Sequence, residues 1–353
     1  MDRIPPMNTP AFAAQCGTLL AEAGYDERIQ DVQPLTRGGN NKVWCIKTKN
    51  GRYLTKQYFR HTADSRDRLS VEFEFTRYAH AIVPHTVSCP IARDPINGFA
   101  IFQFLSGKPF AAGEIGDLEV LAASDFFAEI NDRHCRVHAA HLPNASEACF
   151  SIIDHLALVR NRIQQLQAAF AASAIDVEAR TFVAVLWNRW QTLEGKIIDN
   201  AYKHGLMPDA ELPTEQRCIS PSDFGFHNAL RDEDGTIRFI DFEYAGWDDP
   251  AKMIGDFFAQ LAVPVPAYYF DAFAEKVLNC FPGVSLLMVR ARLLRLAYQV
   301  KWCCIALNVF HPVNLARRKF ANPDLDECEL KRVQLAKAQT LFHSLILSNH
   351  GLH

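Results

Sequence analysis

The sequence predicts an α+β fold in which a small, mostly antiparallel sheet is followed by a mostly helical lobe. Apolar and polar residues alternate on both sides of Asn50 and Gly51, which is typical of a β-hairpin. Two further strand-like runs follow at 86–92 and 98–104, the second being GFAIFQF. Beyond a Gly/Pro break at 105–110, the spacing of apolar residues is helical over most of the chain.

The first lobe is expected to occupy residues 1–105 and the second lobe residues 106–353. In the first lobe, a short amphipathic helix at 10–24 precedes the hairpin and stops at Gly24. A second helix at about 64–81 follows the third strand. The order strand, strand, strand, helix, strand, strand describes a small sheet with one helix packed against it.

The second lobe is expected to be built largely from helices. Their approximate ranges are 117–140, 150–171, 176–204, 251–261, 266–280, 286–309 and 325–347. One segment interrupts the helices, because short strands around 229–231 and 237–241 flank the turn sequence DEDG. This turn returns the second strand beside the first, so residues at the ends of the two strands should lie close together.

Composition and charge narrow the classes of protein that fit this chain. Of the 353 residues, 49% are hydrophobic and 22% are charged, which is ordinary for a soluble globular protein. The formal net charge is -3 and no long basic run occurs, so nucleic-acid binding is not indicated. The longest apolar runs fall short of the roughly 18 residues that a membrane span needs. The N-terminus lacks the apolar stretch of a signal peptide.

The pattern of cysteines indicates the redox state of the compartment in which the protein is expected. There are ten, none forms a CxxC pair, and the only adjacent two are Cys303 and Cys304. Because metal-binding spacing is absent, we expect reduced thiols in a cytoplasmic protein. The sequence contains no signal for an oligomeric state.

The segment SPSDFGFHNALRDEDGTIRFIDFEYAGWDDP, residues 220–250, concentrates polar residues in a pattern that suits phosphoryl transfer. Asp223 stands in a turn-rich loop that would hold its carboxylate outward, where it can orient an acceptor hydroxyl and take its proton. Asn228 and Asp241 offer a neutral and a charged oxygen, which are ligands that Mg2+ prefers. We therefore expect Asp223 to be catalytic, and Asn228 and Asp241 to hold the metal.

SDFGFHN and FIDFEYAGWDDP resemble the catalytic core of the aminoglycoside phosphotransferase and choline kinase superfamily, relatives of protein kinases. That pattern has a catalytic Asp, an Asn five positions later, a hairpin, and a metal-binding Asp followed by Phe or a similar residue. IDFEYAG is most similar to the choline-kinase end of the family. The resemblance covers most of the chain in order, and it implies a protein-kinase-like two-lobe fold, ATP as phosphate donor and Mg2+ as metal.

Two positions depart from the family pattern. Many relatives place His two residues before the catalytic Asp, and this sequence has Pro221 there. Relatives also often carry an Asp shortly after the DP motif, where this sequence has Met253, with Asp256 three residues later. Neither change removes a predicted metal ligand, but both alter the residues that support the site.

The resemblance also implies nucleotide contacts in the first lobe. RGGNNKVW is similar to a shortened form of the family's glycine loop, with Gly38 and Gly39 approaching the phosphates and Asn41 in the Asn place. The hinge between the lobes is IFQFLSGKP, so Gln103, Phe104 and Leu105 are placed near the adenine by position.

A lysine and its helix partner complete the implied nucleotide site. Lys56 falls on the third strand, where the family has the Lys that contacts the α- and β-phosphates, and Lys47 is a rival one strand earlier. Glu72 would hold the ammonium in place. Glu74 is the alternative, because the facing of a helix is not fixed by sequence alone.

These residues together predict an ATP- and Mg2+-dependent kinase of a small-molecule hydroxyl. Two alternatives remain: a nucleotide-binding regulator without catalysis, suggested by the missing His, and a protein-directed kinase, for which no phosphorylated activation segment is found. Glu243, Asp248 and Asp249 predict an acidic rim beside aromatic Tyr244 and Trp247. Such a rim would suit a cationic acceptor, an amino sugar or an amino alcohol such as choline or ethanolamine. A neutral sugar stays open, and Asp249 is also a candidate brace for the loop.

Overall fold

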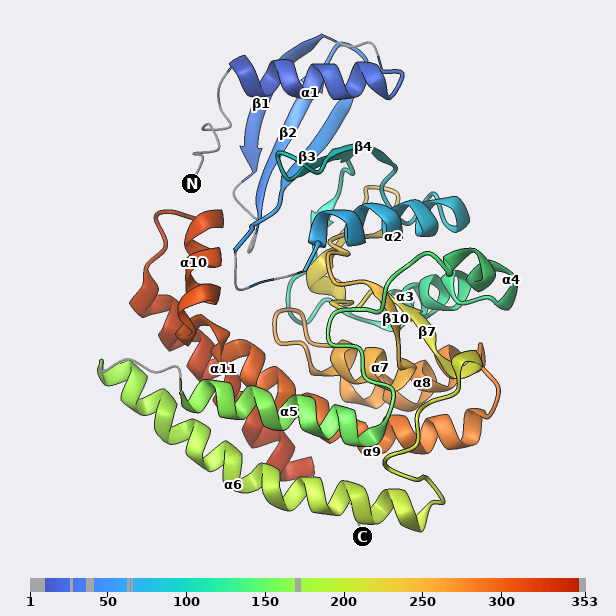
Figure 1. Ribbon diagram of the computed structural model, residues 1–353, viewed down its shortest axis with the longest axis vertical. Coiled ribbons are helices and arrows are strands. Elements are labelled where there is room, and N and C mark those ends of the chain that lie inside the picture. Colours follow the sequence, from blue (N-terminus) through green and yellow to red (C-terminus); the bar gives the residue numbers. More distant parts are fainter. Residues whose placement is uncertain are drawn as a thin grey trace.

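The computed structural model describes residues 10–25, 28–35, 41–61, 64, 66–168 and 173–348, with side chains to residue 345. A small sheet with one covering helix stands above a larger helical lobe (Figure 1). This confirms the predicted α+β, two-lobe architecture.

The first lobe is a five-stranded antiparallel sheet. Its spatial order is β1-β2-β3-β5-β4. The strands are β1 (Ile29–Leu35), β2 (Lys42–Thr48), β3 (Arg52–Gln57), β4 (Pro90–Asp94) and β5 (Phe99–Gln103). The predicted hairpin joins β2 to β3, and the Thr48 N–H donates to the Gly51 carbonyl at 2.9 Å to close its turn.

Two helices flank this sheet. Helix α1 (Pro10–Glu22) packs on one face through Phe12, whose ring lies 5.4 Å from that of Trp44 and 5.7 Å from that of Phe99. Helix α2 (Arg68–Ile82) begins at Asp67, whose side chain accepts from the Ser70 N–H at 3.0 Å, and it lies between the sheet and the helical lobe (Figure 1).

The second lobe consists of helices around one large core. They are α3 (Asp117–Ile130), α4 (Arg133–Arg136), α5 (Ile152–Gln167), α6 (Ala174–Lys203), α7 (Pro250–Ala259), α8 (Phe270–Leu278), α9 (Val284–Ala306), α10 (Pro312–Ala321) and α11 (Glu327–Ser348). Helix α9 is central and contacts α5, α6, α7, α8 and α11. By length and composition, the stretch Val284–Phe310 could cross a membrane, but 72% of its most apolar window is buried inside the protein. Its apolar character is therefore explained by the core.

Short strands carry the segment that interrupts the helices. Strands β6 (Lys108–Pro109), β8 (Ala229–Arg231) and β9 (Ile237–Phe239) form one small sheet. Strands β7 (Cys218–Ser220) and β10 (Gly246–Asp248) form another. The predicted lobe boundary after residue 105 falls between β5, which ends the first sheet, and β6, which pairs with the second lobe.

Two helix predictions are wrong. The helix expected over 117–140 ends at Ile130, because the buried Asn131 turns its side chain to Ile219, accepting from its N–H at 2.7 Å and donating to its carbonyl at 2.9 Å. Helix α10 was not expected at all. It is only ten residues long, none of them is buried, and prolines at 312 and 323 bound it, so the sequence resembles a loop there.

Candidate active site

Asp223 lies in the loop between β7 and β8. The neighbouring Phe224 and Phe226 are buried in the core, where their rings lie 5.4 Å and 5.8 Å from that of Phe257. Ser222 adopts a positive φ of 66°, which turns the chain just before Asp223. The loop is therefore anchored on both sides of a partly exposed carboxylate, as the pattern of turn residues predicts.

Two polar neighbours hold this loop in place. The Asp223 Oδ1 lies 3.1 Å from the Nε2 of His227, and the Asn228 side-chain amide donates to the Asp223 carbonyl at 3.0 Å. Burial would raise the pKa of Asp223, but the charge and hydrogen bond of His227 outweigh burial, and the pKa lies below its ordinary value. The carboxylate is therefore ionised at neutral pH, which a hydroxyl-orienting role requires.

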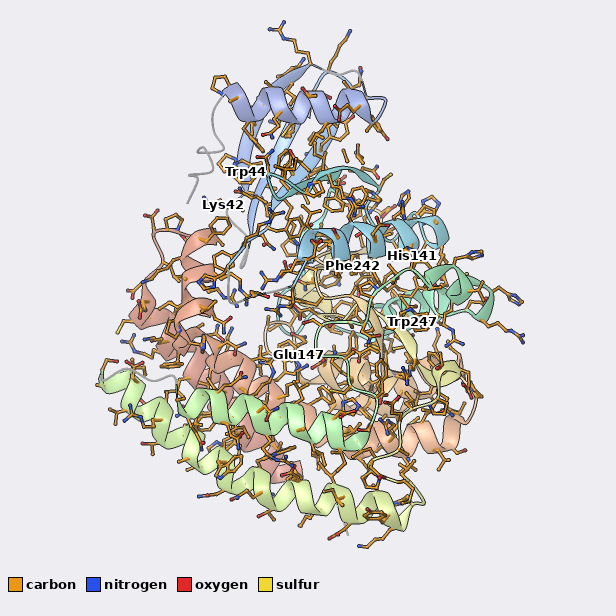
Figure 2. All side chains as sticks on the ribbon, in the orientation of Figure 1. Lys42, Trp44, His141, Glu147, Phe242 and Trp247 are labelled. Carbon is orange, nitrogen blue, oxygen red and sulfur yellow. The ribbon has the colours of Figure 1, made fainter. Side chains whose placement is uncertain are left out.

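Asp241 lies two residues after the end of β9 and reaches the same region. The Ile240 N–H donates to the Asn228 carbonyl at 3.0 Å, so the hairpin brings Asn228 and Asp241 together as predicted. Asp241 has a positive φ of 70°, an unusual conformation for a non-glycine residue. Phe242, the next residue, packs under α2 with its ring 4.8 Å from that of Phe75 (Figure 2).

Lys56 joins the two lobes at this point. Its Nζ lies 2.6 Å from the Glu72 Oε2 and also contacts Asp241. Tyr58 donates a further hydrogen bond to Glu72 at 2.7 Å. Glu74, the alternative partner, pairs instead with Arg77 and Arg93.

Lys47, the rival lysine, is exposed on β2 and faces Asp31 at 3.7 Å. The structure thus distinguishes both pairs of alternatives that sequence could not. By these contacts, Lys56 rather than Lys47 and Glu72 rather than Glu74 form the ion pair beside Asp241.

Negative charge is in excess around Lys56. Oxygen atoms of Glu72, Asp241 and Glu243 all lie within 4.8 Å of one another, while Lys56 pairs with Glu72 and Asp241. Burial raises the pKa of Glu72 to about 7 and, together with the Glu243 charge, raises that of Asp241 above its ordinary value. A divalent cation would relieve this repulsion.

The donor set fits Mg2+. Asp241 and Glu243 provide carboxylate oxygens, and the Glu243 Oε1 is buried without a hydrogen-bond partner among the described residues. The Asn228 amide nitrogen is committed to the Asp223 carbonyl, which leaves its Oδ1 available as a ligand. Asn228, Asp241 and Glu243 are the residues that would hold the ion.

The position of Glu243 differs from the sequence prediction. It was expected on an exposed rim, yet it is 2% exposed and its Oε2 accepts from the Asn41 side chain at 2.7 Å. The Asn41 Oδ1 in turn accepts from the Phe59 N–H at 3.1 Å, so Asn41 ties the first lobe to this carboxylate. The available signal was its spacing of two residues from Asp241. Gly38 and Gly39 lie outside the described residues.

The other members of the expected acidic rim are also buried and paired. Asp248 binds Lys252 at 2.5 Å, and both are 1% exposed or less. Asp249 begins α7, accepts from the Ala251 N–H at 2.7 Å, and pairs with Arg290 at 2.6 Å. The prediction of an acidic rim is therefore wrong for Asp248, which is paired inside the core, whereas the alternative for Asp249, a brace for the loop, is confirmed.

The two aromatic residues of the predicted rim also have other partners. The Trp247 indole N–H donates to the Ala139 carbonyl at 3.1 Å, and the Tyr244 hydroxyl accepts from Arg317 at 3.0 Å. Two guanidinium groups, those of Arg66 and Arg68, already lie 5.3 Å and 5.6 Å from the centre of the Tyr244 ring.

The two departures from the family pattern have structural counterparts. Met253 is fully buried in the core, and Asp256 binds Lys301 at 2.9 Å and the Trp302 indole N–H at 2.8 Å. His227 contacts Asp223 in a loop that has Pro221 in place of the usual His. Sequence reasoning missed this contact, although a His four residues after an expected catalytic Asp was a signal for it.

The hinge positions are partly committed to the sheet. The Gln103 N–H donates to the Cys89 carbonyl at 2.8 Å, and its own carbonyl accepts from the Ser88 hydroxyl at 2.7 Å. The Phe104 N–H donates to the Arg52 carbonyl at 3.2 Å. Within the described part of the chain, the Leu105 N–H has no such partner, so Leu105 is the best placed of the three to meet a base.

Fold and site together define a kinase-type phosphotransferase, in which a sheet-borne lysine, a helix glutamate and a loop–hairpin of Asp, Asn and Asp meet between two lobes. The chain belongs to the phosphotransferase enzyme family, whose model matches residues 31–276. No curated protein sequence matches the chain.

Solved structures share the fold at low sequence identity. A choline kinase from Cryptosporidium parvum Iowa II is 14% identical, with a TM-score of 0.56 over 91% of each chain. A choline/ethanolamine kinase family protein from Mesorhizobium loti is 15% identical, with a TM-score of 0.52 over 95% of each chain. A spectinomycin phosphotransferase is 12% identical, with a TM-score of 0.53 over 94% of this chain and 100% of its own.

Proposed function

We propose that this protein transfers the γ-phosphate of ATP to a hydroxyl group of a small molecule, with Mg2+ as the required metal. The observation that carries the proposal is the contact of buried Lys56 with both Glu72 and Asp241, beside the loop of Asp223. A further support is that the spectinomycin phosphotransferase of the same fold was solved with ADP.

Each residue has one task in this reaction. Lys56 would bind the nucleotide phosphates, with Glu72 fixing its ammonium. Mg2+, held by Asn228, Asp241 and Glu243, would neutralise phosphate charge when bound. Asp223 would accept a hydrogen bond from the acceptor hydroxyl, aim its oxygen at the phosphorus and take its proton late in the transfer.

Turnover of ATP with Mg2+ across a panel of alcohols tests this proposal. Asp223→Ala should lower kcat by about 100-fold or more, as expected for loss of a group that transfers a proton. Asp241→Asn should also abolish most turnover, because a charged metal ligand is lost. Asp234→Asn is the matched control, since this exposed residue lies at the turn of the same hairpin, where its side chain accepts from the Thr236 N–H at 2.9 Å. Undiminished turnover in the first two variants would contradict the assignment.

A nucleotide-binding regulator is the second candidate, and Pro221 in place of the usual His is the feature that favours it. The two functions differ in one measurement. If ATP with Mg2+ raises the Tm of the protein while no phosphate reaches any acceptor, including water, the regulator is supported and the enzyme is not.

A further inference from the structure

An arginine cluster lies around Tyr244, the residue that follows Glu243. Arg66 precedes α2, Arg68 is its first residue, and Arg317 and Arg318 lie on α10. Figure 1 shows α10 on the sheet-facing side of the helical lobe.

Contacts with the first lobe fix α10 in this position. The Phe320 ring lies 5.4 Å from that of Phe59, and the Lys42 ammonium lies 4.6 Å from the centre of the Phe320 ring. Phe59 also donates its N–H to Asn41, the residue that holds Glu243. These contacts place α10 against the first lobe, next to the residues that would bind the metal.

Among the described residues, no carboxylate forms an ion pair with Arg317. One of its N–H groups donates to the neutral Tyr244 hydroxyl at 3.0 Å, while its Nε is buried and has no partner among the described residues. A guanidinium has five N–H donors and is always charged. A partly buried cation with one neutral partner is costly unless an anion joins it.

The neighbouring arginines add to this positive potential. Arg66 and Arg68 share a single carboxylate, that of Asp64. Burial and the charge of Arg317 lower the pKa of Arg318, whereas the charges of Asp223 and Glu243 act in the opposite direction.

The charge of the buried Glu243 acts on Arg68 and Arg318, and two other carboxylates of this region are paired with cations of their own. Glu147, which lies between α5 and the active-site segment in Figure 2, pairs with Arg162 at 2.6 Å and faces Lys301 at 4.0 Å. Asp256 pairs with Lys301. The two carboxylates and the two cations of this region, Arg162 and Lys301, therefore balance.

We infer that the acceptor carries an anionic group, a carboxylate or a phosphate ester, which Arg317 binds beside the Tyr244 hydroxyl while the acceptor's own hydroxyl meets Asp223. This deepens the proposed function and rests on it. A guanidinium matches the planar geometry of both anions. The inference excludes the cationic amino alcohols and amino sugars that an acidic rim would have favoured.

Pairs of acceptors that differ in one charged group test the inference. Serine is compared with ethanolamine, and glycerol phosphate with glycerol, by measuring kcat/KM with ATP and Mg2+. The wild type should prefer the anionic member of each pair. Arg317→Gln should lower kcat/KM for that member by about 10- to 100-fold, mainly through KM, because a charge-assisted hydrogen bond is lost. Arg317→Lys should restore part of the loss.

Lys319→Gln is the matched control, because Lys319 lies on the same helix but is exposed and pairs with Glu327 at 2.8 Å. It should behave as the wild type. The KM for ATP should be unchanged in every variant. A rise of the ATP KM in Arg317→Gln would instead assign the guanidinium to the nucleotide γ-phosphate, and a wild-type preference for the neutral or cationic members would also overturn the inference.

Binding of inorganic sulfate provides a second readout that does not depend on turnover. At equal ionic strength, sulfate in place of chloride should raise the Tm of the wild type and of Lys319→Gln more than that of Arg317→Gln. An equal rise in all three proteins would overturn the anion site. If sulfate distinguishes the variants but no acceptor is phosphorylated, the anion site stands and the proposed kinase function fails.

Discussion

Lys56 and Lys47 lie on neighbouring strands, yet their surroundings give them different roles. The side chain of Lys56 is 7% exposed and contacts two carboxylates, whereas that of Lys47 is 43% exposed and faces one at 3.7 Å. An exposed ion pair of this kind contributes little, while a buried cation on a phosphate acts at low dielectric.

We therefore expect Lys56→Met to lower kcat by about 100-fold or more, the usual cost of removing one group that stabilises transition-state charge. Lys47→Met should leave kcat within about twofold of the wild type. Steady-state kinetics with ATP and Mg2+ check both variants, and circular dichroism confirms that each is folded. Equal losses in the two variants would contradict the distinction drawn between the lysines.

Glu147 gives a prediction about pH. Burial would raise its pKa, but the charges of Arg162 and Lys301 outweigh burial and lower it from 4.5 to about 2. Because the pKa is lower in the folded protein, the ionised form stabilises the fold above pH 4.5. That contribution is lost as the pH falls from 4.5 towards 2.

Urea denaturation of the wild type and Glu147→Gln at two pH values measures this contribution. At pH 7 the wild type should be more stable by about 2 kcal/mol, after allowance for the partial exposure of the side chain. At pH 3 the difference should have shrunk to less than half. A difference that stays constant between the two pH values would show that Glu147 keeps its ordinary pKa.

At the level of single residues, sequence identified the parts of the site whose spacing is fixed by local structure. Asp223, Asn228 and Asp241 lie on one loop and one hairpin, so their proximity follows from turn residues alone. The link between Asn41 and Glu243 joins positions 202 residues apart, and no local pattern encodes it. The burial of Asp248 and Asp249 likewise depends on Lys252 and on residues from other helices.

Among the elements, helix α9 holds the active-site segment from below through a buried ion pair. Arg290 is 4% exposed, donates to Asp249 at 2.6 Å and to the Phe150 carbonyl at 3.0 Å, and so fixes the start of α7. His155 lies 3.0 Å from the same carboxylate. Removal of Arg290 would leave Asp249 as a buried charge without its cation.

Arg290→Ala should accordingly lower the free energy of unfolding by about 3–5 kcal/mol, as is usual when one member of a buried ion pair is removed. Arg292→Ala is the matched control two residues away, because Arg292 pairs with Asp271 and both side chains are more than half exposed. Its effect should stay within about 0.5 kcal/mol. Chemical denaturation measures both, and comparable losses would contradict a structural role for the Arg290–Asp249 pair.

Elements were predictable wherever their own sequence determined them. The β2–β3 hairpin follows from alternation around Asn50 and Gly51, and the long helices follow from their apolar period. The end of α3 at Ile130 was not predictable, because the cause is a contact of Asn131 with Ile219 on a distant strand. Helix α10 was not predicted for a related reason. Contacts with the first lobe, rather than an apolar face of its own, hold it in place.

On the scale of the whole molecule, the hydrophobic core is divided unequally. The sheet and α1 share a small cluster of their own, built from Phe12, Cys16, Leu20, Trp44, Ile46, Tyr53, Phe99 and Ile101. Helix α2 belongs to the first lobe by sequence, yet Phe75, Tyr78 and Ala79 pack in the large core of the helical lobe. The Tyr78 hydroxyl also donates to the Ile130 carbonyl at 2.6 Å.

This division implies that the sheet can open while the helical lobe stays folded. Phe12→Ala removes the ring that contacts both Trp44 and Phe99, at a cost of about 3–5 kcal/mol to the small cluster. Native-state hydrogen exchange should then speed up in β2, β3 and β5 but not in α6 or α9, since local opening needs only the free energy of its own unit. Trp190→Ala, in the large core, is the converse control and should speed up exchange in both helices. Because Lys56 and Asn41 come from the sheet side, Phe12→Ala should also weaken ATP binding without unfolding the loop of Asp223. If hydrogen exchange instead speeds up equally in both lobes, the chain opens as one cooperative unit.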